Sequence, residues 1–191
     1  MAARIRTFVA IDVAPGVRHS ILREMPKLVA AAPHFNWVKV ENLHFTLSFF
    51  GEVHDRELPE ICQAIQKAVQ SIEEFELEIV GLNAFPSSDR IKYVWAGVEH
   101  GKQELCQLQA AVASAANQLG FPRDREVYKP HLTLARAARS DSSNDGILSA
   151  LVPLGARSFG ICSIDEVIVY ASYLERQGPT YVPMSTISLS H

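Results

Sequence analysis

The pattern His-x-Thr-Leu occurs twice, as His44-Phe45-Thr46-Leu47 and as His131-Leu132-Thr133-Leu134. The two copies lie 131 − 44 = 87 residues apart, which is nearly half of a chain of 191 residues. A shuffled chain of this composition would contain about 0.02 copies of the pattern, so chance is a poor explanation for two. If the halves of the chain are related by approximate twofold symmetry, each half contributes one copy to a common cleft.

Both copies lie in apolar surroundings that are typical of β-strands. Side chains alternate between the two faces of a strand, so His44 and Thr46 share one face, as do His131 and Thr133. The apolar residues between and after them point to the opposite face, toward a core. Each half of the chain is therefore expected to present one imidazole and one hydroxyl to the same space.

Two imidazoles and two hydroxyls suit chemistry at a phosphodiester. A neutral imidazole can take a proton from an attacking water, and a protonated imidazole can give one to the leaving oxygen. Both forms exist near neutral pH because imidazole titrates there. The two hydroxyls can donate hydrogen bonds to the non-bridging oxygens of the phosphate, where charge grows in the transition state. This chemistry needs no metal, and the sequence has no dense carboxylate cluster to hold one.

The pattern of apolar residues around the motifs predicts an α+β fold with mainly antiparallel sheets. Strands are expected at residues 4–12, 37–40, 42–50, 75–80, 91–98, 131–136, 157–163, 165–172 and 180–189. Helices are expected at residues 15–31, 55–71, 102–119 and 146–152, and turns at 85–89 and 140–146. Pro26 should shorten or kink the first helix. No linker marks a boundary, so residues 1–191 are expected to form a single domain.

The composition excludes several other classes of protein. Hydrophobic residues make up 48% and charged residues 20%, as in ordinary globular proteins. With Lys+Arg 18 and Asp+Glu 21 the net charge is −3, too acidic for a protein that coats long duplex nucleic acid. The cysteines Cys62, Cys106 and Cys162 form no CxxC pair, which disfavours a zinc knuckle or a disulfide scaffold and fits a cytoplasmic location. No apolar run reaches the length of a membrane span.

The paired motif resembles that of the 2H phosphoesterase superfamily, and in particular the RNA 2′,3′-cyclic phosphodiesterase family, historically called 2′-5′ RNA ligase. The resemblance covers essentially the whole chain. Its further segments are Arg6-Thr7-Phe8-Val9-Ala10-Ile11, Trp37-Val38, Asn42-Leu43, Phe49-Phe50-Gly51, Phe85-Pro86, Val94-Trp95-Ala96-Gly97-Val98, Pro130 with Ala135-Arg136, Tyr170-Ala171-Ser172 and Gly178-Pro179-Thr180-Tyr181.

The resemblance implies a bilobal, pseudo-twofold fold with two mainly antiparallel sheets around a central cleft and helices on the outer faces. It also implies hydrolysis of RNA 2′,3′-cyclic phosphate ends to 2′-phosphomonoesters without a metal or another cofactor. By the same resemblance His44 is the proton donor to the leaving 3′ oxygen and His131 is the proton acceptor that activates water. Thr46 and Thr133 would bind the phosphate, and Arg136 matches the basic residue that follows the second motif.

Phe49 and Arg136 stand five positions after His44 and His131, so strict alternation places them on the opposite face of each strand. A β-bulge or a strand end would turn both toward the mouth of the cleft. There Phe49 could stack a terminal base, and Arg136 could hold phosphate or stack as well. The alternatives are a core position for Phe49 and a surface ion pair for Arg136. Trp95 is interpreted as a core or packing residue.

Other functions stay open on the sequence alone. The same site could act on small cyclic nucleotides or on 2′-5′ linked RNA, including the reverse ligation. A different class is a non-catalytic module that binds RNA ends, although binding alone does not need both imidazoles. A histidine-based metal hydrolase is disfavoured by the absence of HExxH and of a spacing for two histidines and one carboxylate. The protein is expected to act as a monomer that binds no membrane.

Overall fold

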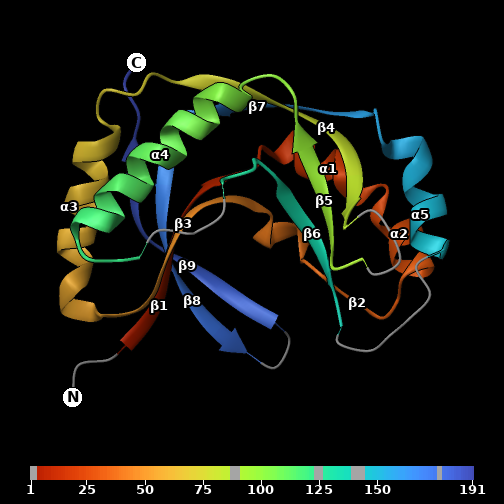
Figure 1. Ribbon diagram of the computed structural model, residues 1–191, viewed down its shortest axis with the longest axis horizontal. Coiled ribbons are helices and arrows are strands. Elements are labelled where there is room, and N and C mark those ends of the chain that lie inside the picture. The colour runs from red at the N-terminus through yellow and green to blue at the C-terminus, as the bar shows by residue number, and fades with distance from the viewer. Residues whose placement is uncertain (1–3, 87–90, 123–126, 139–144, 176–177) are drawn as a thin grey trace.

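The two His-x-Thr-Leu segments begin at the strands β3 (His44–His54) and β6 (Leu132–Ala137), which belong to different sheets (Figure 1). The arrangement comes from a computed structural model that describes residues 4–86, 91–122, 127–138, 145–175 and 178–191. The sheet of β3 has the order β3-β1-β8-β9, with β1 Arg4–Asp12, β8 Glu166–Glu175 and β9 Gly178–Ser188. The sheet of β6 has the order β2-β6-β5-β4-β7, with β2 Phe35–Trp37, β5 Tyr93–Val98, β4 Phe75–Phe85 and β7 Ser158–Ile164.

The helices form two groups, one for each sheet (Figure 1). The first group contains α3 (Leu58–Val69) and α4 (Lys102–Gln118), which pack on each other and contact β9 and β3. The second group contains α1 (Pro15–Leu22), α2 (Met25–Ala31) and α5 (Asp145–Leu151), of which α1 contacts β7 and α5 contacts β4. Most of the buried apolar side chains from both sheets and from the helices belong to one continuous cluster.

These observations confirm the predicted α+β fold with two antiparallel sheets. The predicted effect of Pro26 is confirmed as well, because the expected helix over 15–31 is broken and Pro26 lies in the first turn of α2. Pro59 similarly lies in the first turn of α3, which a short 3₁₀ helix (η2, Asp55–Glu57) precedes. A second 3₁₀ helix, η3 (Val152–Leu154), follows α5.

Two predicted strands have the wrong bounds. The strand expected over 37–40 ends at Trp37, and a 3₁₀ helix (η1, Val40–Asn42) follows it, because Asn42 is held by a 2.8 Å hydrogen bond from its side-chain amide to the Pro179 carbonyl. The strand expected over 75–80 continues to Phe85. Gly81 adopts a φ of +75° there, and a Cβ at this position would clash with the Gly155 carbonyl oxygen. The resulting bulge lets the strand continue past a position that only glycine fits.

The remaining elements lie within a few residues of their predicted bounds. The predicted turns over 85–89 and 140–146 fall largely outside the described residues. Among the helices that the structure describes, none has both the length and the apolar character needed to cross a membrane.

Candidate active site

A β-bulge at the fourth residue of the first motif sets the direction of the side chains that follow it. Opposite β1, Thr46 pairs with Ala10 and Ser48 pairs with Val9, so Leu47 is the extra residue. Phe49 then pairs with Phe8, which lies on the same face of β1 as Ala10. Phe49 therefore shares the face of Thr46. Its side chain is 51% exposed, so it does not belong to the core.

The second motif has a bulge at the equivalent position. Opposite β5, Thr133 pairs with Trp95 and Ala135 pairs with Val94, so Leu134 is the extra residue. Arg136 pairs with Tyr93 and shares the face of Thr133. A bulge was predicted because Phe49 and Arg136 lie an odd number of residues after their histidines. It is present in both strands, at the leucine of each His-x-Thr-Leu segment.

His44 is half-buried at the start of β3, and both of its ring nitrogens have partners. Its Nδ1 lies 2.8 Å from the carbonyl oxygen of Asn42, and its Nε2 lies 3.0 Å from Oγ1 of Thr46. A carbonyl oxygen can only accept a hydrogen bond, so Nδ1 carries a hydrogen. Nε2 is then the nitrogen whose proton comes and goes, and it points at the threonine hydroxyl of its own motif.

His131 is exposed just before β6, and its ring is held in the same way. Its Nδ1 lies 2.7 Å from the carbonyl oxygen of Lys129, again two residues earlier in the chain. The tautomer is therefore the same as in His44, with the hydrogen on Nδ1 and the free electron pair on Nε2. The ring of Trp95 approaches it edge-on, with 6.2 Å between centroids. Trp95 thus packs against a candidate catalytic residue.

Aromatic rings surround His44. Its ring centroid lies 5.0 Å from that of Phe8 and 5.2 Å from that of Tyr181, which meets it edge-on. Phe8 also stacks with Tyr170 at 5.3 Å and lies 6.0 Å from Phe49. Neither Tyr181 nor Phe8 was predicted to lie at the site, although both lie in segments that carry the family resemblance.

Burial lowers the pKa of His44, and it outweighs the hydrogen bond to the Asn42 carbonyl and the charge of Asp12, which both raise it. The positive charge of Arg136 lowers the pKa of His44 further. Asp12 accepts a 2.8 Å hydrogen bond from the hydroxyl of Tyr170 and forms a 3.2 Å ion pair with Arg18. Burial and Asp12 together raise the pKa of Tyr170, so its hydroxyl stays protonated and donates to Asp12. The carboxylate beside His44 is therefore fixed from two sides.

The two motif strands approach each other although they belong to different sheets. Strands β3 and β6 are in contact. The charge of Arg136, from the second sheet, acts on both His44 and Tyr181 of the first. Groups from the two sheets thus meet near His44.

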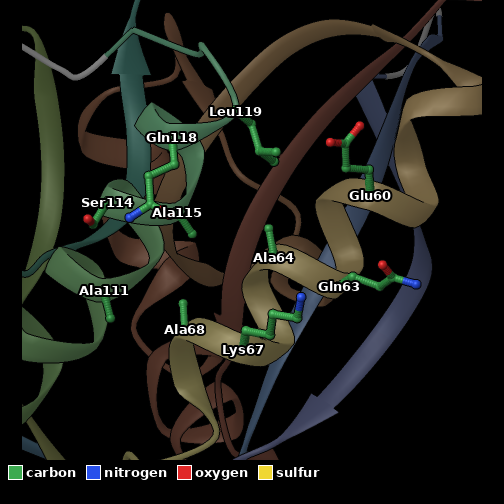
Figure 2. A pocket seen from close by; sticks show the side chains of 10 residues that line it. All are labelled: Glu60, Gln63, Ala64, Lys67, Ala68, Ala111, Ser114, Ala115, Gln118 and Leu119. Carbon is green, nitrogen blue, oxygen red and sulfur yellow. The ribbon is translucent and has the colours of Figure 1, made fainter.

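A separate groove lies between α3 and α4 (Figure 2). Its lining residues come from these two helices and from the residue that follows α4, and none belongs to either His-x-Thr-Leu segment. They are Glu60, Gln63, Ala64, Lys67, Ala68, Ala111, Ser114, Ala115, Gln118 and Leu119. Within the described ranges, no group of three or more His, Cys, Asp or Glu side chains could hold a metal ion.

Comparison with known proteins identifies the family of the chain. Residues 18–170 match the model of the 2′-5′ RNA ligase superfamily. The chain is 32% identical to a protein of Methanothermobacter thermautotrophicus named RNA 2′,3′-cyclic phosphodiesterase, over 97% of this chain and 100% of the relative. A protein of Archaeoglobus fulgidus with the same name is 30% identical, over 93% of this chain and 96% of the relative.

The fold has a solved counterpart. The crystal structure of E. coli LigT complexed with 3′-AMP superposes with a TM-score of 0.74 at 25% sequence identity, covering 98% of this chain and 99% of that one. The family match extends over most of the chain, and the relatives and the fold agree with it along nearly the full length. The chain therefore belongs to the 2′-5′ RNA ligase superfamily, the 2H phosphoesterases.

Proposed function

We propose that this protein hydrolyses the 2′,3′-cyclic phosphate at the end of an RNA strand to a 2′-phosphomonoester, with His44 and His131 as acid and base. The observation that carries the proposal is that the two histidine rings are held in the same way. Nδ1 of each ring donates a hydrogen bond to a backbone carbonyl, so Nε2 is the nitrogen that can exchange a proton. The names of the relatives from M. thermautotrophicus and A. fulgidus support the substrate and the reaction.

The reaction proceeds as a single displacement at phosphorus. Nε2 of His131 takes a proton from a water molecule, whose oxygen forms a new bond to the phosphorus atom. The bond between phosphorus and the 3′ oxygen breaks, and Nε2 of His44 gives its proton to that oxygen. The products are a 2′-phosphomonoester and a 3′ hydroxyl, so one water has been added across one P–O bond. Proton exchange with solvent then restores both rings.

The environment of His44 suits a general acid. A lowered pKa makes its protonated form a stronger acid, which transfers its proton more readily to a leaving alkoxide. Binding of an anionic phosphodiester near the ring opposes the effect of burial, because a negative charge favours the protonated imidazole. Substrate binding therefore increases the protonated fraction of His44, the residue that later donates a proton to the leaving oxygen.

The polar residues after each histidine fit the binding of the phosphate. Oγ1 of Thr46 lies 3.0 Å from Nε2 of His44, so its hydroxyl stands beside the nitrogen that donates to the leaving oxygen and can donate its own hydrogen to a phosphate oxygen. Thr133 and Arg136 lie on one face of β6 and would contribute a second hydroxyl and a positive charge. Phe49 is exposed and is assigned to stacking of the terminal base.

The proposal treats residues 1–191 as a single domain that acts as a monomer in the cytoplasm. The continuous apolar core that joins both sheets supports the single domain. Both histidines come from one chain, so the site as proposed does not need a second copy. The reaction uses only side chains and water, so it is proposed to be independent of metal ions and of cofactors.

The test is product analysis with an oligonucleotide that ends in a 2′,3′-cyclic phosphate, carried out in excess EDTA. The expected product carries its phosphate on the 2′ oxygen, and the rate is unchanged by the chelator. A product with a 3′-phosphate would contradict the assignment of the leaving group. A large loss of activity in EDTA, restored by a divalent metal, would contradict the metal-independent mechanism.

A further inference from the structure

Exposed aromatic side chains continue the proposed site across the second sheet. The pairing of strands places Phe85 of β4 beside Tyr93 of β5, and Tyr93 beside Arg136 of β6. The neighbouring row on the same face contains Trp95 and Thr133. Side chains directly opposite each other in an antiparallel sheet lie on the same face, so all five side chains line one surface.

The aromatic rings of this surface are accessible to solvent. Phe85 is 54% exposed and Tyr93 is 38% exposed, although large aromatic side chains usually lose most of their exposure on folding. The neighbouring side chains do not bury either ring. Adjacent aromatic rings left open beside a polar site are typical of a binding surface rather than of a packing defect.

A cation lies close to each of these rings. Nζ of Lys129 is 6.0 Å from the ring centroid of Phe85, and the guanidinium of Arg136 is 5.6 Å from that of Tyr93. Flat rings that can stack with bases, together with cations that can contact phosphates, are the combination with which proteins bind single-stranded nucleic acid. The charge of this surface favours a polyanion over an apolar or basic partner.

We propose that Phe85, Tyr93 and Lys129 bind the nucleotides that precede the cyclic-phosphate nucleotide in an RNA strand. The inference rests on the proposed function, because it takes the cyclic phosphate to lie beside Thr133. A 2′,3′-cyclic phosphate lies on the last nucleotide of a strand, so all other nucleotides of the RNA are on its 5′ side. They must therefore extend away from the site in that one direction. Strands are about 4.8 Å apart in a sheet, so Phe85 stands about 10 Å from Arg136, a short extension beyond the terminal nucleotide.

This surface predicts a preference for oligonucleotides over single cyclic nucleotides. The experiment compares kcat/KM for uridine 2′,3′-cyclic phosphate with kcat/KM for a tetranucleotide that ends in the same group. The wild-type protein is expected to prefer the tetranucleotide. Phe85→Ala should lower kcat/KM for the tetranucleotide by about fivefold or more, because stacking on one ring contributes that much. The same variant should leave kcat/KM for the cyclic mononucleotide unchanged.

Control variants separate stacking from a loss of structure. Phe85→Trp retains an aromatic ring and should keep the preference. Tyr173→Ala removes a ring of similar exposure, 46%, from β8 in the other sheet. It should change kcat/KM for neither substrate. Lys129→Met should weaken the dependence of tetranucleotide binding on salt, because one phosphate contact is lost. Thermal unfolding followed by circular dichroism checks that each variant folds.

The inference would be overturned if Phe85→Ala lowered kcat/KM equally for both substrates, or lowered it for neither. Fluorescence anisotropy with a labelled tetranucleotide that ends in a 3′-phosphate provides a readout independent of turnover, and Phe85→Ala should bind it more weakly than the wild type does. If the wild-type protein hydrolyses neither cyclic substrate, the proposed function fails. The anisotropy result then still decides whether this surface binds RNA, and equal affinity in the variant counts against it.

Discussion

The two copies of His-x-Thr-Leu have the same backbone geometry but different surroundings. In both, Nδ1 of the histidine faces a carbonyl two residues earlier, and the leucine forms a bulge. His44, however, is half-buried against Phe8 and Tyr181, whereas His131 is exposed and has the edge of Trp95 beside it. A repeated backbone geometry thus places the two histidines equivalently, and their neighbours make them chemically different.

This difference matters because acid and base catalysis place opposite demands on an imidazole. A group that must give its proton benefits from surroundings that disfavour its charged form, and burial has this effect on His44. A group that must take a proton from water needs access to water, and exposure gives His131 that access. The asymmetry therefore supports the assignment of His44 as acid and His131 as base.

The largest effects are expected from removing either ring. His44→Ala and His131→Ala should each lower kcat for a cyclic-ended oligonucleotide by about 100-fold or more, because general acid and base catalysis contribute at least that much. His19→Ala on α1 provides a control that should keep wild-type turnover. The measurement is steady-state hydrolysis with folding checked by circular dichroism. Near-normal turnover in either motif variant would remove that histidine from the mechanism.

A smaller effect is expected at the two threonines. Thr46→Val and Thr133→Val each remove a hydroxyl assigned to the phosphate, and a hydrogen bond to a charged group contributes about 1.5–3 kcal/mol, or about tenfold or more in kcat/KM. Thr46→Val should have the larger effect because it also removes the partner of Nε2 in His44. Ser in place of either Thr retains the hydroxyl and should restore most of the activity. Unchanged kcat and KM in both valine variants would exclude a role in phosphate binding.

The smallest effect is expected at Asp12, whose charge raises the pKa of His44. Asp12→Asn keeps an oxygen that accepts from Tyr170 but removes the charge, so the pKa of His44 should fall. If His44 is the acid, it must be protonated to act, and activity is lost as pH rises through its pKa. The alkaline limb of the pH profile of kcat/KM should therefore move to lower pH, while the acidic limb stays in place.

The control for this pH profile is Asp55→Asn, which removes a carboxylate from η2 and should move neither limb. Movement of the acidic limb in Asp12→Asn would show that His44 acts as the base. No movement of either limb would mean that the charge of Asp12 does not reach the titrating ring.

The sequence predicted the histidines and threonines of the candidate site because they lie in a short local pattern with a strand period. The odd spacing of Phe49 and Arg136 also pointed to bulges, but Leu47 and Leu134 look like ordinary strand residues. Leu47 and Leu134 are left without a paired residue because of how β1 and β5 align with the motif strands. A single sequence does not show that alignment.

The contacts of Tyr181 and Trp95 were not predicted for a similar reason. Tyr181 reaches His44 from β9, two strands beyond β1 in the sheet, so its position depends on the shape of the whole sheet. Trp95 stands in an apolar strand, where an aromatic residue is usually part of a core. The strand expected over 37–40 failed for a tertiary reason too, since the hydrogen bond from Asn42 to Pro179 favours a 3₁₀ turn over an extended chain.

The opposite roles of the two histidines at one phosphorus atom can be tested with a cyclic phosphate whose 3′ bridging oxygen is replaced by sulfur. A thiolate leaves without needing a proton, so this substrate bypasses the acid but still needs the base. We expect His44→Ala to regain most of the wild-type rate on the sulfur substrate and His131→Ala to remain inactive. Rescue of His131→Ala instead, or equal rates for the two variants, would show that His44 is not the acid or that His131 is not the base.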